Sequence, residues 1–455
     1  MRQILSILIL MMVASRAHSE ATKDSVSSFW YLSPSGSDAN DGRTQATAKR
    51  SPQVVADLAM PGDTIYFLDG VFENLTRSTV LTIKRSGQPG KPISFRAFPG
   101  THPVLHNRQG WDVIKLVGVS HIEVSGLTLK GHADIISFDE AEREKNNLQN
   151  RRTSDNCLMI TRDPKTRTPS SHIEIKNNTI LDCGGAGLVA SYSDYLNFEG
   201  NVVSRCAFWS PYGNSGISIY QPTSIDDSLG IKIRIRNNVV FGIDNKVPFF
   251  FSKPNNPEER TPSDGNGIII DDNLNTQTRA GPAQHAYVGR TLVSNNVVFG
   301  NGGSGIRVFK SRNVSVLYNY VANNNLRFQQ GMGEISAIKA TDLKILNNVI
   351  VSAQVPYSVF SDVPAQIEFS HNILEGTLFG KSKDLLKVTG NKQVLTGIRL
   401  TDWTNGARKF DVDPKSPAIA NAQPSKEEVL DFFGNLRSLK NPDAGAFNLT
   451  ARQRK

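Results

Sequence analysis

Short apolar segments that end in asparagine recur along the chain. In seven of them an alternating apolar segment leads into an asparagine and two apolar or β-branched residues follow. These asparagines are Asn178, Asn201, Asn238, Asn296, Asn319, Asn348 and Asn372, at spacings of 23, 37, 58, 23, 29 and 24 residues. Alternation of this kind indicates β-strands. A recurring interval near 23 predicts stacked coils of a parallel β-helix, in which longer intervals carry loops.

A second repeat begins at glycine. Gly187, Gly216, Gly267 and Gly305 each open a short apolar strand, and Gly187 and Gly305 lie fourteen residues before a repeat asparagine. Glycine and asparagine tolerate backbone conformations that other residues resist, which suits them to the bends. Stacked asparagines can also bond one another along the axis. We therefore expect a structural role for the asparagines.

The two ends of the repeat region carry further patterns. Residues 31–42, 61–66 and Gly70 resemble the N-terminal entry of secreted right-handed parallel β-helix proteins, and residues 410–419 and 443–447 resemble their C-terminal tail. Many members of that family are polysaccharide lyases of the pectate-lyase type. The resemblance covers roughly residues 29–447 and implies an all-β, right-handed parallel β-helix of about ten coils.

The same resemblance suggests a division of the chain. We expect an N-terminal cap with the first coils at residues 28–110, the β-helix at 111–400, and an irregular tail at 401–455. Residues 131–171 and 242–264 interrupt the coil spacing and are expected to be loops that wall a groove.

The N-terminus predicts export. Arg2 precedes an apolar run at residues 4–14, and Ala17-His18-Ser19 supplies small residues at the expected cleavage positions. This order is typical of a signal peptide, here residues 1–19, and predicts a secreted or periplasmic protein. No later run is long and apolar enough for a membrane span.

The composition indicates which class of partner the protein binds. The 455 residues are 38% hydrophobic, enough for a packed core, and the formal net charge of +9 becomes +7 without the signal peptide. A basic exported protein is suited to an anionic polysaccharide. We see no nucleic-acid motif, and we expect a monomer.

Three cysteines are an odd number for a disulfide framework. Cys183 and Cys206 each lie five residues after a repeat asparagine, which predicts that they are stacked neighbours on adjacent coils. A disulfide between them and a stack of two buried thiols both agree with this spacing. Cys157 lies outside this register.

Aligning the coils on their glycines separates inward from outward positions, because side chains alternate along a strand. The first and third residues after each glycine are apolar throughout, as a core requires. The second and fourth become polar or charged over several coils. The bend position that follows reads Tyr192, Gln221, Asp272, Lys310 and Lys339. This contrast predicts a site on the outer face.

Acidic and basic residues meet in this predicted site. Asp264, Asp271 and Asp272 carry the hard oxygen ligands that Ca²⁺ prefers. Since neighbouring coils are about 4.8 Å apart, Lys310 is expected to touch Asp272. Calcium would neutralise a uronate carboxylate and acidify the adjacent carbon, and a neutral Lys310, assisted by Arg307, would remove its proton. These parts resemble those of calcium-dependent β-helix lyases, which carry a fuller acidic cluster.

Other interpretations of these residues stay open. The pair of Asp272 and Lys310 can be a structural salt bridge, and the three aspartates can serve a glycoside hydrolase, whose chemistry needs two carboxylates. A noncatalytic glycan-binding protein is the third interpretation. For substrate binding the candidates are Trp209, Tyr212, Tyr220, Gln221 and Lys339, although Trp209 and Tyr212 can equally pack their own loop.

Overall fold

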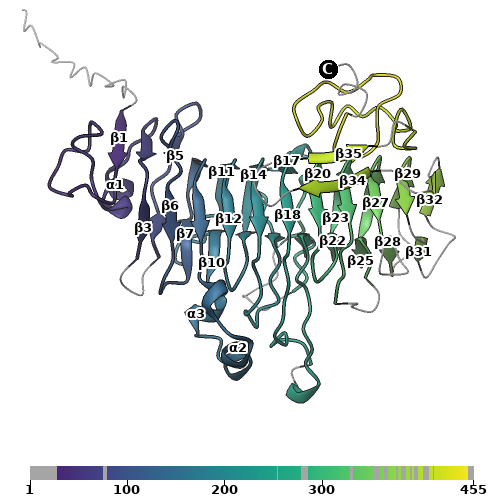
Figure 1. Cartoon of the computed structure of the whole chain (residues 1–455), viewed down its shortest axis with the longest axis horizontal. Helices are drawn as coiled ribbons and strands as arrows, with labels where there is room; N and C mark the ends of the chain where they lie inside the picture. Colours follow the sequence, from purple (N-terminus) through teal and green to yellow (C-terminus); the bar gives the residue numbers. More distant parts are fainter. Residues whose placement is uncertain are drawn as a thin grey trace, which may run out of the picture.

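The computed structural model describes residues 28–74, 79–253, 255–277, 285–327, 332–352, 359–362, 367–375, 378–380, 386–389, 392–393, 398–402, 409–412 and 415–448. Within these residues the chain winds into an elongated stack of coils with three long parallel sheets (Figure 1). The all-β parallel β-helix is thereby confirmed. The predicted signal peptide, residues 1–19, lies outside the described residues.

Each coil contributes one strand to each sheet, and each strand pairs with its equivalent in the next coil. The twelve strands of sheet A are β1 (Phe29–Leu32), β2 (Thr64–Phe67), β5 (Ile93–Ala97), β8 (Ser120–Ser125), β11 (Ser170–Lys176), β14 (Ser193–Glu199), β17 (Ile231–Arg236), β20 (Arg290–Ser294), β23 (Arg312–Leu317), β26 (Thr341–Leu346), β29 (Ile367–Ser370) and β32 (Leu386–Thr389). The eleven of sheet B are β3 (Val71–Glu73), β6 (Val104–His106), β9 (Thr128–Lys130), β12 (Thr179–Leu181), β15 (Val202–Ser204), β18 (Val239–Phe241), β21 (Val297–Phe299), β24 (Tyr320–Ala322), β27 (Val349–Val351), β30 (Ile373–Glu375) and β33 (Lys392–Gln393). The ten of sheet C are β4 (Leu81–Ile83), β7 (Asp112–Val117), β10 (Asn156–Thr161), β13 (Leu188–Ser191), β16 (Ile217–Tyr220), β19 (Ile268–Asp271), β22 (Ile306–Phe309), β25 (Ile335–Ile338), β28 (Val359–Ser361) and β31 (Leu378–Gly380).

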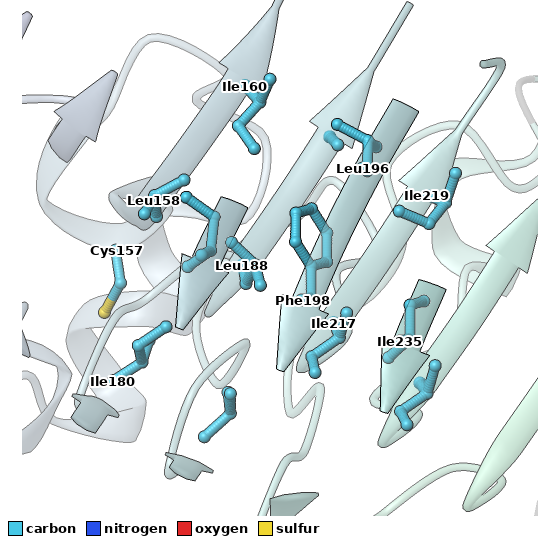
Figure 2. Packing of buried hydrophobic residues seen from close by; sticks show 14 of the residues in the cluster. Cys157, Leu158, Ile160, Ile180, Leu188, Leu196, Phe198, Ile217, Ile219 and Ile235 are labelled. Carbon is cyan, nitrogen blue, oxygen red and sulfur yellow. The ribbon is translucent and has the colours of Figure 1, made fainter. Parts of the chain in front are cut away.

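The predicted inward columns form the core. Leu188 pairs with Ile217, and Ile268 pairs with Ile306, in the register that the glycine alignment predicts. All four side chains are fully buried. Figure 2 shows Leu188 and Ile217 of sheet C reaching the same interior as Phe198 of sheet A. Burial of these apolar columns is the main stabilising term of such a coil stack.

The repeat asparagines form a continuous ladder at the corner between sheets A and B. Each side-chain amide donates to the side-chain oxygen of the next asparagine, from Asn178 to Asn372, over distances of 2.9–3.0 Å. All seven are buried. The residue before each of them has a positive φ, as at Asn295 with 54°. The structural role predicted for these asparagines is confirmed.

The glycines that open the sheet C strands serve a different purpose from the one expected. None of Gly187, Gly216, Gly267 and Gly305 has φ in the left-handed range. A Cβ atom on Gly267 would lie 2.4 Å from Cγ1 of Val298 and 2.7 Å from the carbonyl oxygen of Gly305. Close packing against the neighbouring coil, rather than backbone freedom, requires glycine here.

The disulfide joins other partners than those predicted. Cys157, at the start of β10, is bonded to Cys183, while Cys206 is a buried free thiol. Of the two alternatives that the spacing left open, a disulfide between Cys183 and Cys206 is therefore excluded, and Cys206 is a buried thiol. Their Cα atoms are 5.6 Å apart, because Cys157 begins a strand of sheet C and Cys183 lies after β12, shortly before the next strand of sheet C.

Several segments leave the coils. The helix α1 (Pro52–Leu58) lies at the N-terminal end, and Gln53 bonds the backbone of Thr82 in β4. The stretch 131–171 is not all loop, because it contains β10 as well as α2 (Phe138–Glu144) and α3 (Arg151–Ser154). Figure 1 shows α2 and α3 projecting beyond the sheets. Short 3₁₀ helices lie at Ala133–Ile135 and Pro257–Glu259.

The C-terminal segment packs along the side of the coils. β34 (Ile398–Asp402) and β35 (Lys409–Val412) form an antiparallel pair, and the irregular residues 415–448 follow (Figure 1). The buried Arg437 donates to Asn295 Oδ1 and to the carbonyl oxygen of Gly445. Among all described residues, we find no helix with the length and apolarity that crossing a membrane requires.

Candidate functional site

A cleft of about 740 Å³ lies on the outer face of sheet C. Its floor is the first outward column of five consecutive strands, which runs Met159, Val189, Ser218, Ile269 and Arg307. The second outward column supplies Ser191, Tyr220, Asp271 and Phe309 to the same cleft. The face that the sequence singled out is thus a concave surface.

Two excursions from the coils wall this cleft. Residues 131–155 form the first, and residues 242–264, which supply Phe249 and Phe251 to the lining, form the second. The two touch, since Arg260 donates to Asn146 Oδ1 at 3.2 Å. Tyr212 also lines the cleft, and its hydroxyl donates to the carbonyl oxygen of Leu148.

A buried carboxyl group anchors the base of the first wall. Asp155 is inaccessible to solvent and accepts hydrogen bonds from the Gly184 amide at 2.8 Å and from Asn107 Nδ2 at 3.2 Å. Burial raises the pKa of Asp155 to about 8. Its neighbours Ser154 and Asn156 line the cleft. A buried carboxyl group with a raised pKa therefore holds this edge of the cleft through the hydrogen bonds it accepts.

Charged side chains gather at the end of the cleft nearest β22. Arg307 Nη1 lies 3.3 Å from Asp264 Oδ1, and this ion pair is largely shielded from solvent. Asp271 accepts a hydrogen bond from Gln277 Nε2 at 3.0 Å. Burial, followed by the neighbouring charge of Asp264, raises the pKa of Asp271 to about 7, against the opposing effect of Arg307. Two carboxyl groups with different surroundings thus share one cleft with a guanidinium.

Lys310 occupies the bend at the end of β22, in the left-handed region with φ of 45°. Its side chain lines the cleft and lies beside the ring of Phe309, with Nζ 5.4 Å from the ring centroid. Within the described part of the chain, its amine makes no hydrogen bond or ion pair. The register places Lys310 next to Asp272 in the stack, as predicted, but their side chains do not form the expected salt bridge.

Asp272 is turned into the protein instead. Its buried carboxylate accepts bonds from Thr276 through both the amide and the hydroxyl, and from Gln277 and Gln221. The three contacts from Thr276 and Gln277 close the turn at residues 272–277, and the fourth ties it to the neighbouring coil. Together they explain why Asp272 and Lys310 do not pair.

The acidic residues do not fit a calcium site. Asp272 is saturated by protein donors, and Asp264 is paired with Arg307. Among the described residues, no group of three or more acidic, histidine or cysteine side chains could hold a metal ion. Calcium prefers six to eight oxygen ligands. We therefore derive no step through calcium.

The predicted substrate-binding residues divide into two groups. Tyr212 and Tyr220 line the cleft. Trp209 is buried between the two walls, where its indole N–H donates to the carbonyl oxygen of Ala133, so it packs inside the protein. Gln221 is buried against Asp272, and the exposed Lys339, one coil after Lys310, is not among the lining residues.

Several lining residues escaped the sequence analysis. Met159 lies in the stretch 131–171, which the sequence analysis treats as a loop. Extending the outward column by one coil before Val189 identifies it. Phe249 and Phe251 lie in an apolar loop segment, and a loop sequence does not show which of its side chains face a cleft. Trp111, directly before β7, and Gln277 lie outside the repeats, so no sequence pattern identifies them as lining residues.

Comparisons with known proteins agree with this architecture. The family model of the Pel9A-like right-handed β-helix region matches residues 30–341. The crystal structure of pectate lyase Pel9A is 14% identical, with a TM-score of 0.49, over 93% of this chain and 97% of that chain. A structure described as a glycoside hydrolase is 11% identical, with a TM-score of 0.50, over 81% and 96%. At such identities these likenesses bear on the fold alone.

One curated protein matches a smaller part of this chain. The uncharacterized protein YwoF of Bacillus subtilis (strain 168) is 27% identical over 128 residues. That match spans 27% of this chain and 26% of YwoF, about a quarter of its length.

Proposed function

Since the chain belongs to the family of Pel9A-like right-handed β-helix proteins, we propose that it cleaves an acidic polysaccharide by β-elimination in the sheet C cleft. The observation that carries the proposal is Lys310, whose amine lines the cleft beside Arg307 without a polar partner among the described residues. The name of the Pel9A structure, a pectate lyase, agrees with this chemistry.

The proposed reaction assigns one role to each cation. Lys310 Nζ, in its neutral form, takes the proton from the carbon next to the uronate carboxyl group. Arg307, held by Asp264, binds that carboxylate and stabilises the negative charge that develops on it. The bond from the neighbouring ring carbon to the glycosidic oxygen breaks, a carbon–carbon double bond forms, and the leaving oxygen takes a proton from solvent.

The proposed location is outside the cytoplasm. The predicted signal peptide at residues 1–19 supports it, and so does the disulfide between Cys157 and Cys183, because such bonds persist mainly in oxidising compartments.

The test uses purified protein with a panel of uronate-containing polysaccharides. β-Elimination yields an unsaturated uronate, which absorbs ultraviolet light. Lys310→Ala is expected to lower turnover about 100-fold or more, the effect typical of losing a general base. Lys84→Ala, an exposed lysine directly after β4 of the same sheet, is the matched control and is expected to keep full activity. Unchanged turnover in Lys310→Ala would refute the assignment.

A second candidate function is glycoside hydrolysis. Asp264 and Asp271 line the same cleft, and Asp271, with its pKa raised to about 7, resembles a general acid. Hydrolysis would release reducing ends without ultraviolet absorbance, and Asp271→Asn would abolish it. If glycans bind and neither product appears, binding without catalysis becomes the better account.

A further inference from the structure

The C-terminal segment presents an apolar surface to solvent. Five of the fifteen large apolar side chains that are exposed in the described part of the chain lie within residues 429–439. They are Val429, Leu430, Phe433, Leu436 and Leu439, which together form an apolar tip, and Leu436 and Leu439 are exposed by 65% and 76%. Single exposed apolar side chains are ordinary on a protein surface, whereas a concentration of them is typical of a surface that binds a partner.

Hydrogen bonds hold the hairpin that carries the apolar tip. Leu430 and Leu436 lie opposite each other in an antiparallel bridge, so their side chains leave the same face of the hairpin. The buried Asp431 closes its turn by accepting hydrogen bonds from the amides of Phe433 and Asn435 at 2.9 and 2.7 Å. Because the backbone is already ordered while the apolar side chains remain outside, a partner that binds them has little order to impose.

The exposed charges around the apolar tip are positive. Among the charged side chains of residues 425–443, only Lys426 and Lys440 are exposed, and they bracket the apolar tip in the sequence. The carboxylates are withdrawn from the surface, since Glu427 is paired with Arg290 and Glu428 is buried. Apolar side chains between exposed lysines are suited to a surface that is anionic outside and apolar within, as a lipid bilayer is.

The sequence that follows adds to this charge. Asn448, the last described residue, donates to the carbonyl oxygen of Leu436 at 3.0 Å, so the described chain ends beside the apolar tip. Residues 449–455 include Arg452, Arg454 and Lys455 and no acidic residue. A second copy of the chain on the same surface would bring the cations of both copies together, which is unfavourable. Charge complementarity therefore favours an anionic partner over self-association.

The apolar tip also lies away from the cleft. In Figure 1 the C-terminal segment lies above the sheets, whereas α2 and α3, which belong to the first wall of the cleft, project below them. A large surface that binds the apolar tip therefore leaves the cleft open to polymers in solution.

We propose that the apolar tip, together with Lys426 and Lys440, attaches the protein to an anionic lipid bilayer. The leucine side chains enter the boundary between headgroups and acyl chains, and the lysines contact the lipid phosphates. This attachment is a function separate from the chemistry of the cleft and does not depend on it.

Sedimentation with lipid vesicles tests the proposal. The protein is used without residues 1–19, whose apolar run would itself enter lipid. It is expected to bind vesicles that contain phosphatidylglycerol about tenfold or more tightly than vesicles of phosphatidylcholine alone, and added salt is expected to weaken this binding. Leu436→Glu combined with Leu439→Glu is expected to weaken it about tenfold or more. Leu58→Glu, at an exposed leucine of α1, is the matched control and is expected to bind as wild type does.

The outcomes decide between lipid and other occupants. Absence of binding to the phosphatidylglycerol vesicles, or equal binding by the wild type and the double leucine variant, would overturn the proposal. Self-association without vesicle binding, abolished by the same variant, would identify a second copy as the occupant and would overturn it too. Should the leucine variants fail to fold, Lys426→Glu combined with Lys440→Glu keeps the apolar side chains and is expected to lose the preference for anionic lipid; an unchanged preference would contradict the proposal.

Discussion

Replacing one asparagine in the middle of the ladder tests how much this row contributes to stability. Asn296 donates to the Ile235 carbonyl oxygen and to Asn319 Oδ1, and its own oxygen accepts from the amide and side chain of Asn238. Asn296→Ala removes these four bonds at a site without solvent access. At about 1 kcal/mol for each buried bond, the expected loss of unfolding free energy is about 4 kcal/mol.

Guanidinium unfolding followed by circular dichroism measures this loss. The matched control is Asn441→Ala, an exposed asparagine, for which a change within about 0.5 kcal/mol is expected. If Asn296→Ala lost no more free energy than the control, the hydrogen bonds of the ladder would contribute nothing net, and the reasoning from buried polar groups would be refuted.

Two further predictions concern other buried positions. Burial raises the pKa of Asp155 to about 8 from the ordinary aspartate value of 3.8. Its contribution to stability is therefore full below about pH 4 and is lost as pH rises through about 8, and the unfolding free energy falls by up to about 1.4 kcal/mol per pH unit between these values. Asp155→Asn has nearly the same shape and does not titrate, although its one oxygen can accept only one of the two bonds from Gly184 and Asn107. Its stability is therefore lower overall, but thermal unfolding across pH 4–8 should show a flatter dependence than wild type, whereas parallel curves would contradict the assigned protonation. Gly267→Ala forces a Cβ against Val298 and is expected to cost about 1–3 kcal/mol in the same unfolding assay, as overpacking does. Gly230→Ala, whose Cβ would meet only Ser228 Oγ at 3.5 Å, is its control, and equal losses would show that packing is not the cause.

The repeat made the fold predictable because each coil obeys the same periodicity. Inward positions such as Leu188 and Ile217, and ladder positions such as Asn201, are fixed by local spacing, so a one-dimensional pattern locates them. The disulfide was not predictable in this way. Cys157 belongs to a strand that lies within a long stretch without a visible repeat, so the spacing of the repeat could not place it beside Cys183.

The site was predictable only as far as backbone register determines it. Arg307 and Asp271 line the cleft because strand alternation directs them outward. Asp272 and Lys310 occupy a bend, where alternation ends and the following loop decides where each side chain points. That is why the carboxylate of Asp272 is buried in its turn while Lys310 faces the cleft.

The asparagine ladder also has a direction. From Asn178 to Asn348 each side-chain amide donates one N–H to the oxygen of its C-terminal neighbour, so the asparagine-to-asparagine bonds all run in one direction along the axis. Aligned amides polarise one another, and a bond inside a long row is stronger than the same bond at its end. A defect at Asn296 therefore divides one long array into two short ones, whereas a defect at Asn178 only shortens it. The ladder therefore has a direction along the solenoid, and its hydrogen bonds are expected to contribute most to stability in the middle coils.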